Sequence, residues 1–83
     1  MIILYFSWIR QKLGTGEERF DVPETIKTVT DLAKHLRARG GPFAEVFSDL
    51  KRLRSAVNQE HVGWEASVGQ GDEVAFFPPV TGG

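Results

Sequence analysis

The residues with the most distinctive chemistry stand together at the C-terminal end, where the sequence closes on Gly82-Gly83. Glycine has no Cβ, so a Gly-Gly segment can thread a slot that is too narrow for other residues. The segment offers no side-chain chemistry, and its reactive group would be the terminal carboxylate of Gly83. A partner enzyme that must reach and activate a C-terminal carboxylate would need such an end. We therefore expect Gly83, preceded by Gly82, to be the chemical centre of this protein.

A stiff spacer precedes the two glycines. Pro78-Pro79 cannot donate hydrogen bonds to a sheet, so a strand should end there and the chain should continue as an extended arm. From Pro79 to Gly83 this arm can reach about 15 Å at roughly 3.3 Å per residue. We expect a single domain over residues 1–83, with a flexible C-terminal tail at 79–83.

A short apolar segment, Val74-Ala75-Phe76-Phe77, leads into the spacer and follows a Gly71-Asp72 turn signal. Its strand-forming residues and flanking breakers predict a β-strand. Side chains alternate along a strand, so Val74 and Phe76 in the core would place Ala75 and Phe77 on the outer face.

The rest of the sequence predicts a small α+β domain. Ile2 to Ser7 is continuously apolar, which predicts a strand buried on both faces. Thr28-x-x-Asp31 followed by an apolar stripe predicts the main helix, closed by Gly40-Gly41-Pro42. The other expected elements are a short helix at 8–13, a strand at 17–22, a short helix at 43–47, and strands at 53–57 and 61–63. Helices and strands are segregated, which favours a mixed sheet wrapped over one main helix.

Composition limits the classes of partner. The chain has 41% apolar and 25% charged residues and a formal net charge of −1 at pH 7, so nothing favours nucleic acid or a membrane. It has no cysteine, which excludes a disulfide framework and a thiolate nucleophile. The apolar run at the N-terminus is too short for a signal peptide or a membrane span. We therefore expect a cytoplasmic protein.

The sequence shows no constellation for catalysis by side chains. Such catalysis needs a nucleophile beside a base, paired carboxylates or a metal. His35 and His61 are far apart in the sequence and have no neighbouring acid cluster, which disfavours a zinc site. No glycine-rich phosphate loop is present. We expect no bound cofactor, no metal and no enzymatic activity of the chain on its own.

Three blocks of the sequence resemble the MoaD family, the small sulfur-carrying subunits of molybdopterin synthase. The blocks are Gly71 to Gly83, then Ala56-Val57-Asn58-Gln59, and more weakly the opening strand with Phe6, Arg10, Leu13 and Gly14. The resemblance extends over the whole chain and is loose between Glu17 and Leu53. It implies a ubiquitin-like β-grasp fold, with the first and last strands side by side and parallel at the centre of the sheet.

The resemblance also implies a reaction cycle. A MoeB-like adenylating partner, similar to ubiquitin-activating enzymes, would use ATP to convert the Gly83 carboxylate to an acyl-adenylate. A sulfur donor protein would then supply the sulfur of a Gly83 thiocarboxylate. The tail would insert into the large, MoaE-like synthase subunit, where cyclic pyranopterin monophosphate receives two sulfurs to form the dithiolene of molybdopterin. Two small and two large subunits would form the assembly.

Docking residues follow from the same resemblance and from the strand alternation. Phe6 and Arg10 match family positions at the partner interface, and aromatic residues and arginine are enriched at such interfaces. The residues expected to bind a partner are Phe6, Arg10, Phe77, Pro78, Pro79, Val80 and Thr81.

Three alternatives stay open at the level of the sequence. One is a ThiS-like carrier of the thiazole pathway, which the Phe-Phe-Pro-Pro-Val spacer disfavours. Another is a ubiquitin-like modifier that is attached to lysines through the same tail. The third is a β-grasp interaction module whose tail has no role, so that removal of Gly82-Gly83 would leave its activity intact.

Overall fold

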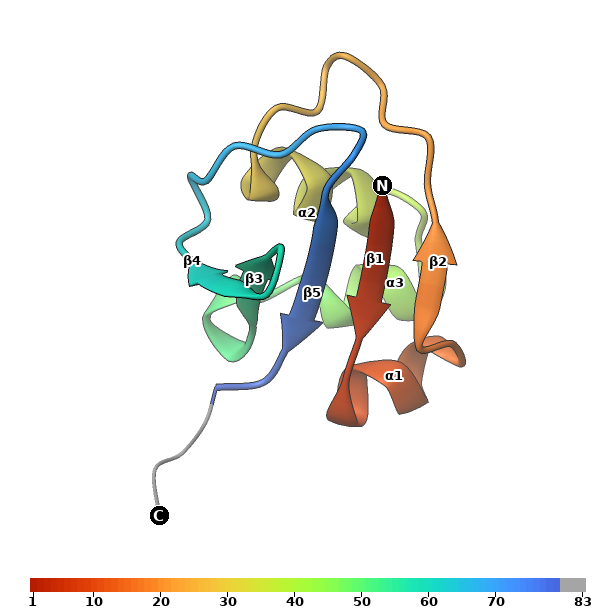
Figure 1. Ribbon diagram of the computed structural model, residues 1–83. Coiled ribbons are helices and arrows are strands. Elements are labelled where there is room, and N and C mark those ends of the chain that lie inside the picture. Colours follow the sequence, from red (N-terminus) through yellow and green to blue (C-terminus); the bar gives the residue numbers. More distant parts are fainter. Residues whose placement is uncertain (80–83) are drawn as a thin grey trace.

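Two parallel strands from opposite ends of the sequence form the centre of the structure (Figure 1). The computed structural model describes residues 1–79. In it, β1 (Ile2–Tyr5) pairs with β5 (Glu73–Phe77) in a register that places Ile3 beside Val74 and Tyr5 beside Phe76. The parallel central pair expected from the sequence is confirmed.

Three further strands extend this pair into a mixed sheet of order β2-β1-β5-β3-β4. The added strands are β2 (Glu17–Arg19), β3 (Arg54–Val57) and β4 (Glu60–Val62). β2 lies antiparallel to β1, and β3 lies antiparallel to both β4 and β5. β1 and β2 are shorter than the strands that the sequence predicts at residues 2–7 and 17–22.

The helices lie on one face and at one end of the sheet (Figure 1). They are α1 (Ser7–Leu13), α2 (Val29–Arg37), α3 (Gly41–Val46) and a short 3₁₀ turn, η1 (Leu50–Arg52). This is the α+β, ubiquitin-like β-grasp arrangement, with a mixed sheet over one main helix. None of the helices within residues 1–79 is long and apolar enough to cross a membrane.

The main helix begins as the sequence predicts. The Thr28 hydroxyl accepts a hydrogen bond from the Asp31 N–H at 3.2 Å, and the Asp31 carboxylate accepts one from the Thr28 N–H at 3.1 Å. These two bonds form a capping box, which satisfies backbone donors that the first helical turn leaves free. The N–H groups of Lys27 and Thr28 also hold the pKa of the Asp31 carboxyl below its usual value.

The end of the main helix differs from the expectation. α2 stops at Arg37, before the Gly40-Gly41-Pro42 segment. Gly40 instead adopts a left-handed φ of 79° and begins α3, where Pro42 occupies the first turn. A glycine that tolerates positive φ and a proline with fixed φ together start a new helix in a new direction.

The core fills the space between the sheet and the helices. Side chains of β1 and β5 that face the helices, Ile3, Tyr5, Val74 and Phe76, are buried in one cluster with the apolar stripe of α2 and with residues of and next to α3. Ile2 and Leu4 point the other way and are only half-buried. The prediction that the opening strand is buried on both faces is therefore wrong, because the helices cover only one face of the sheet.

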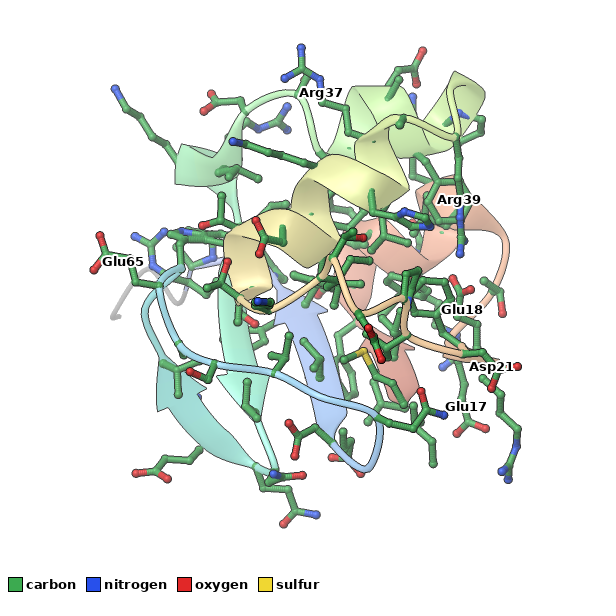
Figure 2. The ribbon with its side chains drawn as sticks, turned by 90° about the horizontal axis from the view of Figure 1, so that it is seen from above. Glu17, Glu18, Asp21, Arg37, Arg39 and Glu65 are labelled. Atoms are coloured by element: carbon green, nitrogen blue, oxygen red, sulfur yellow. The ribbon has the colours of Figure 1, made fainter. Side chains whose placement is uncertain are left out.

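A polar triad of Tyr5, Glu18 and Arg39 closes one edge of the core, and Figure 2 shows Glu18 and Arg39 turned toward each other. The Tyr5 hydroxyl donates to Glu18 Oε1 at 2.6 Å, and the Arg39 guanidinium donates to both oxygens of Glu18 at 2.8 and 2.9 Å. The same guanidinium lies 4.9 Å from the centre of the Phe43 ring. The triad joins β1, β2 and the loop after α2.

Charge and burial act in opposite directions on the Glu18 carboxyl. Burial raises its pKa, but hydrogen bonds from Arg39 and Tyr5 outweigh that effect and place the pKa below its ordinary value of 4.5. Burial, reinforced by Glu18, also raises the pKa of the Tyr5 phenol. The carboxylate is therefore the form that stabilises the folded chain, and its protonation weakens the triad.

We predict that Glu18→Gln reduces the free energy of unfolding at pH 7 by about 1 kcal/mol, because the pair is partly screened by solvent. A depressed folded-state pKa contributes stability above the unfolded-state value and loses it as pH falls through the folded-state value. The difference between the two proteins should therefore close as the pH falls from about 5 through the lowered pKa of Glu18. Chemical denaturation at several pH values measures it. Glu17→Gln, on the exposed neighbour, is the matched control, and an equal loss in that variant would contradict the prediction.

Candidate docking groove and C-terminal exit

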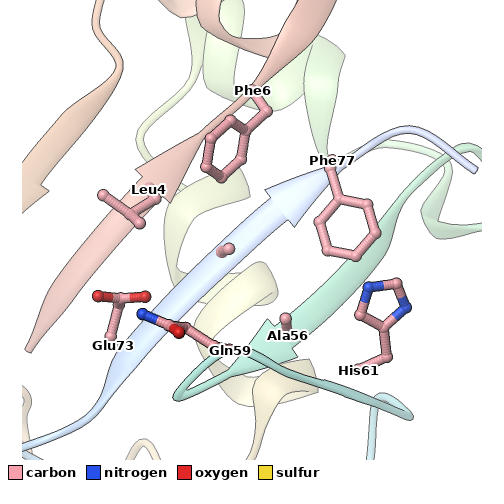
Figure 3. A pocket seen from close by; sticks show the side chains of 8 residues that line it. Leu4, Phe6, Ala56, Gln59, His61, Glu73 and Phe77 are labelled. Carbon is pink, nitrogen blue, oxygen red and sulfur yellow. The ribbon is translucent and has the colours of Figure 1, made fainter.

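The face of the sheet opposite the helices is hollowed into an apolar groove of about 360 Å³ (Figure 3). Its lining residues come from four strands and the segments next to them: Leu4, Phe6, Ala56, Gln59, His61, Glu73, Ala75 and Phe77. No helix covers this surface within the described part of the chain (Figure 1).

Two alanines account for the depth of the groove. Leu4, Ala75, Ala56 and His61 are successive register partners in a row across β1, β5, β3 and β4. The two residues in the middle of this row are alanines, while larger side chains stand at both ends. The short central side chains leave a hollow between higher walls.

Phe6 and Phe77 form the aromatic end of the groove (Figure 3). The Phe6 N–H donates to the Phe76 carbonyl at 3.1 Å, which continues the β1–β5 pairing by one step and places Phe6 beside Phe77. Phe6 is 48% exposed, and neither phenylalanine belongs to the core. The Phe77 ring centre lies 4.9 Å from that of His61. The outward orientation predicted for Ala75 and Phe77 is confirmed, and their binding role stays a prediction.

A left-handed residue holds Phe6 in this place. Ser7 has a φ of 56°, which few residues other than glycine adopt, and it turns the chain sharply from β1 into α1. The Phe6 carbonyl accepts hydrogen bonds from the N–H groups of Ile9 and Arg10 in the first turn of the helix. The strand end and the helix start therefore fix the backbone of Phe6 from both sides.

The polar end of the groove is held by a side-chain clamp. Asn58 and Gln59 form the turn between β3 and β4, with φ values of 52° and 69°. Asn58 Oδ1 accepts from the Glu73 N–H at 3.0 Å, and its Nδ2 donates to Asp72 Oδ1 at 3.0 Å. Asp72 Oδ2 in turn accepts from the Gly69 N–H at 2.8 Å. The clamp ties the turn to the start of β5, which positions Gln59 and Glu73 at this end of the groove.

Arg10 lies apart from the aromatic end. It projects from α1 into a separate polar hollow of about 570 Å³, which Ser7, Gln11, Gly14, Thr15 and Gly16 also line. A Cβ at Gly16 would meet the Arg10 Nε at 3.0 Å, so the glycine makes room for the arginine side chain. The structure thus joins Phe6 to Phe77 and places Arg10 in a neighbouring hollow.

The chain leaves the sheet at Pro78 and Pro79. β5 ends at Phe77, as predicted, and Pro78 and Pro79 follow as half-buried residues without strand structure. The other predicted tail residues, Val80, Thr81, Gly82 and Gly83, lie outside the described residues. The flexibility expected for the tail at 79–83 therefore stays a prediction.

The two histidines belong to different surroundings. The His35 ring lies 5.1 Å from the Phe20 ring on the helical side, whereas His61 lines the groove. Within residues 1–79, no three His, Cys, Asp or Glu side chains gather in a way that could hold a metal ion.

Sequence reasoning named only part of the groove. It placed Phe6, Ala75 and Phe77 on the outer surface but gave no role to Leu4, His61 or Glu73. The alternation along each strand carries the required signal, since Leu4 and Phe6 are two residues apart. The neighbours across the strands follow only from the register.

The strand order and the main helix define a ubiquitin-like β-grasp protein. SAMP1 from Haloferax volcanii superposes with a TM-score of 0.76 at 28% identity, covering 100% of this chain and 98% of that one. A putative molybdopterin converting factor subunit 1 from Pyrococcus furiosus gives a TM-score of 0.74 at 32% identity, covering 95% of each chain.

Sequence comparison places the chain within one branch of that class. The profile of the ThiS family matches residues 3–83. The molybdopterin synthase sulfur carrier subunit of Escherichia coli K12 is 41% identical over 81 residues, which cover 98% of this chain and 96% of that protein. The chain belongs to the ThiS family.

The hydrogen bonds of the Asn58 clamp lead to a prediction about stability, for which the neighbouring Gln59 provides a control. Asn58→Gly keeps the left-handed backbone but removes two hydrogen bonds, so it should lower the free energy of unfolding by about 1–2 kcal/mol. Gln59→Gly relieves a non-glycine residue at positive φ and should leave stability equal or raise it by up to about 1 kcal/mol. Urea unfolding of both variants measures the difference, and equal losses would show that the clamp contributes nothing.

Proposed function

We propose that this protein is the sulfur carrier subunit of a molybdopterin synthase and that Gly83 carries the sulfur as a thiocarboxylate. The observation that carries the proposal is the ending of the central strand: β5 runs out of the sheet into Pro78-Pro79 and a sequence that closes on Gly82-Gly83. Support comes from the relatives of E. coli and Haemophilus influenzae, both named as such carriers, the latter at 35% identity. Their name favours the molybdopterin branch over the thiazole branch.

The chemistry resides in the C-terminus rather than in side chains. A carboxylate is a poor acyl donor, so an adenylating partner would first join the Gly83 carboxylate to AMP, with pyrophosphate released from ATP. A hydrosulfide equivalent would then attack the acyl carbon and displace AMP. The product, a thiocarboxylate, is an anionic sulfur nucleophile at neutral pH. This route accounts for sulfur handling by a chain without cysteine.

The chain is a non-catalytic subunit in this scheme, and its partners supply the active sites. They are a MoeB-like adenylating enzyme, a sulfur donor protein and a large MoaE-like subunit, with two small and two large subunits in the assembly. ATP is consumed by the adenylating partner, and the carrier itself holds no cofactor. The cytoplasm is the expected location.

The groove provides the docking surface for the large subunit. The exposed Phe6 and the half-buried Phe77, beside a hollow of about 360 Å³, suit an apolar anchor from the partner. The surface adjoins the exit of the chain at Pro78-Pro79, so docking at the groove would deliver the tail next to the interface. Phe6 and Phe77 lie on its tail side, Pro78 and Pro79 follow directly in the chain, and Arg10 lies in the adjoining hollow.

The loading of Gly83 gives the direct test. Incubation with the adenylating partner, ATP and sulfide should raise the intact mass by the difference between sulfur and oxygen, and fragmentation should map the change to Gly83. A variant with one additional alanine after Gly83 should stay unmodified. An unchanged mass in the native chain, or isopeptide-linked conjugates in place of the thiocarboxylate, would overturn the proposal.

The docking role of Phe77 is tested separately. Phe77→Ser should weaken binding to the large subunit by about tenfold or more, because truncation of an aromatic hot-spot residue typically costs at least about 1–2 kcal/mol. Phe20→Ser makes the same change on the helical side, where the ring packs near His35 and Arg39. Isothermal titration calorimetry on folded variants measures both. Wild-type affinity for Phe77→Ser would remove Phe77 from the interface.

A further inference from the structure

Basic side chains gather at the end of the molecule where β5 ends. Arg54 is the register partner of Phe77, the last residue of that strand, and Lys51 and Arg52 stand just before it in η1. We refer to Lys51, Arg52 and Arg54 as the cationic flank. Within residues 1–79, none of the three forms an ion pair, whereas Lys12 and Arg39 do. The flank therefore presents three exposed cations beside the exit of the chain, next to the Asp49 carboxylate, which accepts a hydrogen bond from the Lys51 N–H at 3.1 Å.

The two arginines of the flank are held in place without a carboxylate. The Arg52 guanidinium lies 4.9 Å from the centre of the Trp8 ring, a cation–π contact. Arg54 Nη1 donates to the Leu53 carbonyl at 2.8 Å and to the Lys51 carbonyl at 3.3 Å. Side chains that are ordered in advance lose less entropy when a partner binds.

Negative charge collects at the other end of the same strands. Val57 pairs with both Val74 and Glu60, so Glu60 and Glu73 lie at the opposite end of the sheet from Arg54 and Phe77. Asp72 adjoins them in the turn before β5. Along β3, β4 and β5, the acidic residues therefore lie at one end and the cationic flank lies at the other end, next to the exit of the tail.

The positions of these cations indicate that the flank would bind a broad protein surface rather than a small anion. Arg52 rests on an aromatic ring of α1, while Arg54 is turned toward backbone carbonyls of its own segment. They have different supports and do not converge on one point, as ligands of a bound phosphate would. Arg10 adds a further exposed cation on α1, which lies at the same end of the sheet (Figure 1).

We propose that the cationic flank steers this carrier onto its large subunit through a patch of carboxylates on that subunit, which lies to one side of the opening that receives the tail and faces η1 and the start of β3. The inference rests on the function proposed above and adds the chemistry of the docking partner. The apolar groove supplies the anchor, and the charged flank turns the tail end of the molecule toward the partner before contact. Such steering raises association rates by about 10- to 1,000-fold and is lost at high salt.

The test is stopped-flow association with the large subunit, using two triple variants with the same change in net charge. K51Q/R52Q/R54Q neutralises the flank, and K27Q/K34Q/R37Q neutralises exposed cations before and along α2. At low ionic strength the flank variant should associate about tenfold more slowly, with a dissociation rate within about twofold of the native value. At about 1 M salt, where the Debye length is about 3 Å, the rates should converge. K51Q/R54Q retains the Arg52–Trp8 contact and should show an intermediate loss.

The outcomes separate this inference from the proposed function. Equal slowing by both triple variants, or no slowing by the flank variant, would overturn the steering role. A slower association that persists at high salt would overturn it as well. In each of these cases, sulfur transfer by loaded carrier at saturating large subunit would still proceed and leave the proposed function standing. If the native chain failed to bind the large subunit, both the steering role and the proposed function would be contradicted.

Discussion

The pairing of β1 with β5 is the contact on which the rest of the structure depends. It joins residues from the two ends of the sequence, so most of the chain must be folded around it before the pair can form. The same pairing brings Tyr5 next to Phe76 in the core and Phe6 next to Phe77 on the surface. A single register therefore builds the core and the aromatic end of the groove together. A slip of one residue would exchange the two faces and destroy both.

The helices cover only one face of the sheet, so the two faces have different roles. On the covered side, α2 seals an apolar core, and the Tyr5–Glu18–Arg39 triad closes its edge with charge-assisted hydrogen bonds. On the open side, two alanines in the centre of the sheet leave a hollow that no part of residues 1–79 fills. An exposed apolar hollow of this kind is typical of a surface that a partner covers.

The proposed chemistry suits a fold without a catalytic constellation. The chain contains no cysteine, and in the proposed scheme the function depends on the carboxyl group of Gly83. The globular part then has to be rigid at its docking surface, and it has to leave the C-terminal end accessible to the partner enzymes. The Asn58 clamp and the left-handed Ser7 provide that rigidity at the two ends of the groove. In the proposed scheme, the cationic flank adds a preferred direction of approach.

Much of the local structure could be predicted from the sequence, because its causes are local. The capping box at Thr28, the apolar stripe of α2, the left-handed Gly14 after α1 and the end of β5 before Pro78 all depend on residues within one or two turns of each other. The resemblance to a family supplied the parallel central strands and the chemistry expected of the tail. Tertiary structure decided which face stayed open, that His61 lies against Phe77, and that Arg10 occupies a hollow of its own. The physical reason is that periodicity tells which side of a strand or helix is apolar, whereas the neighbour across the sheet is set by long-range register and packing.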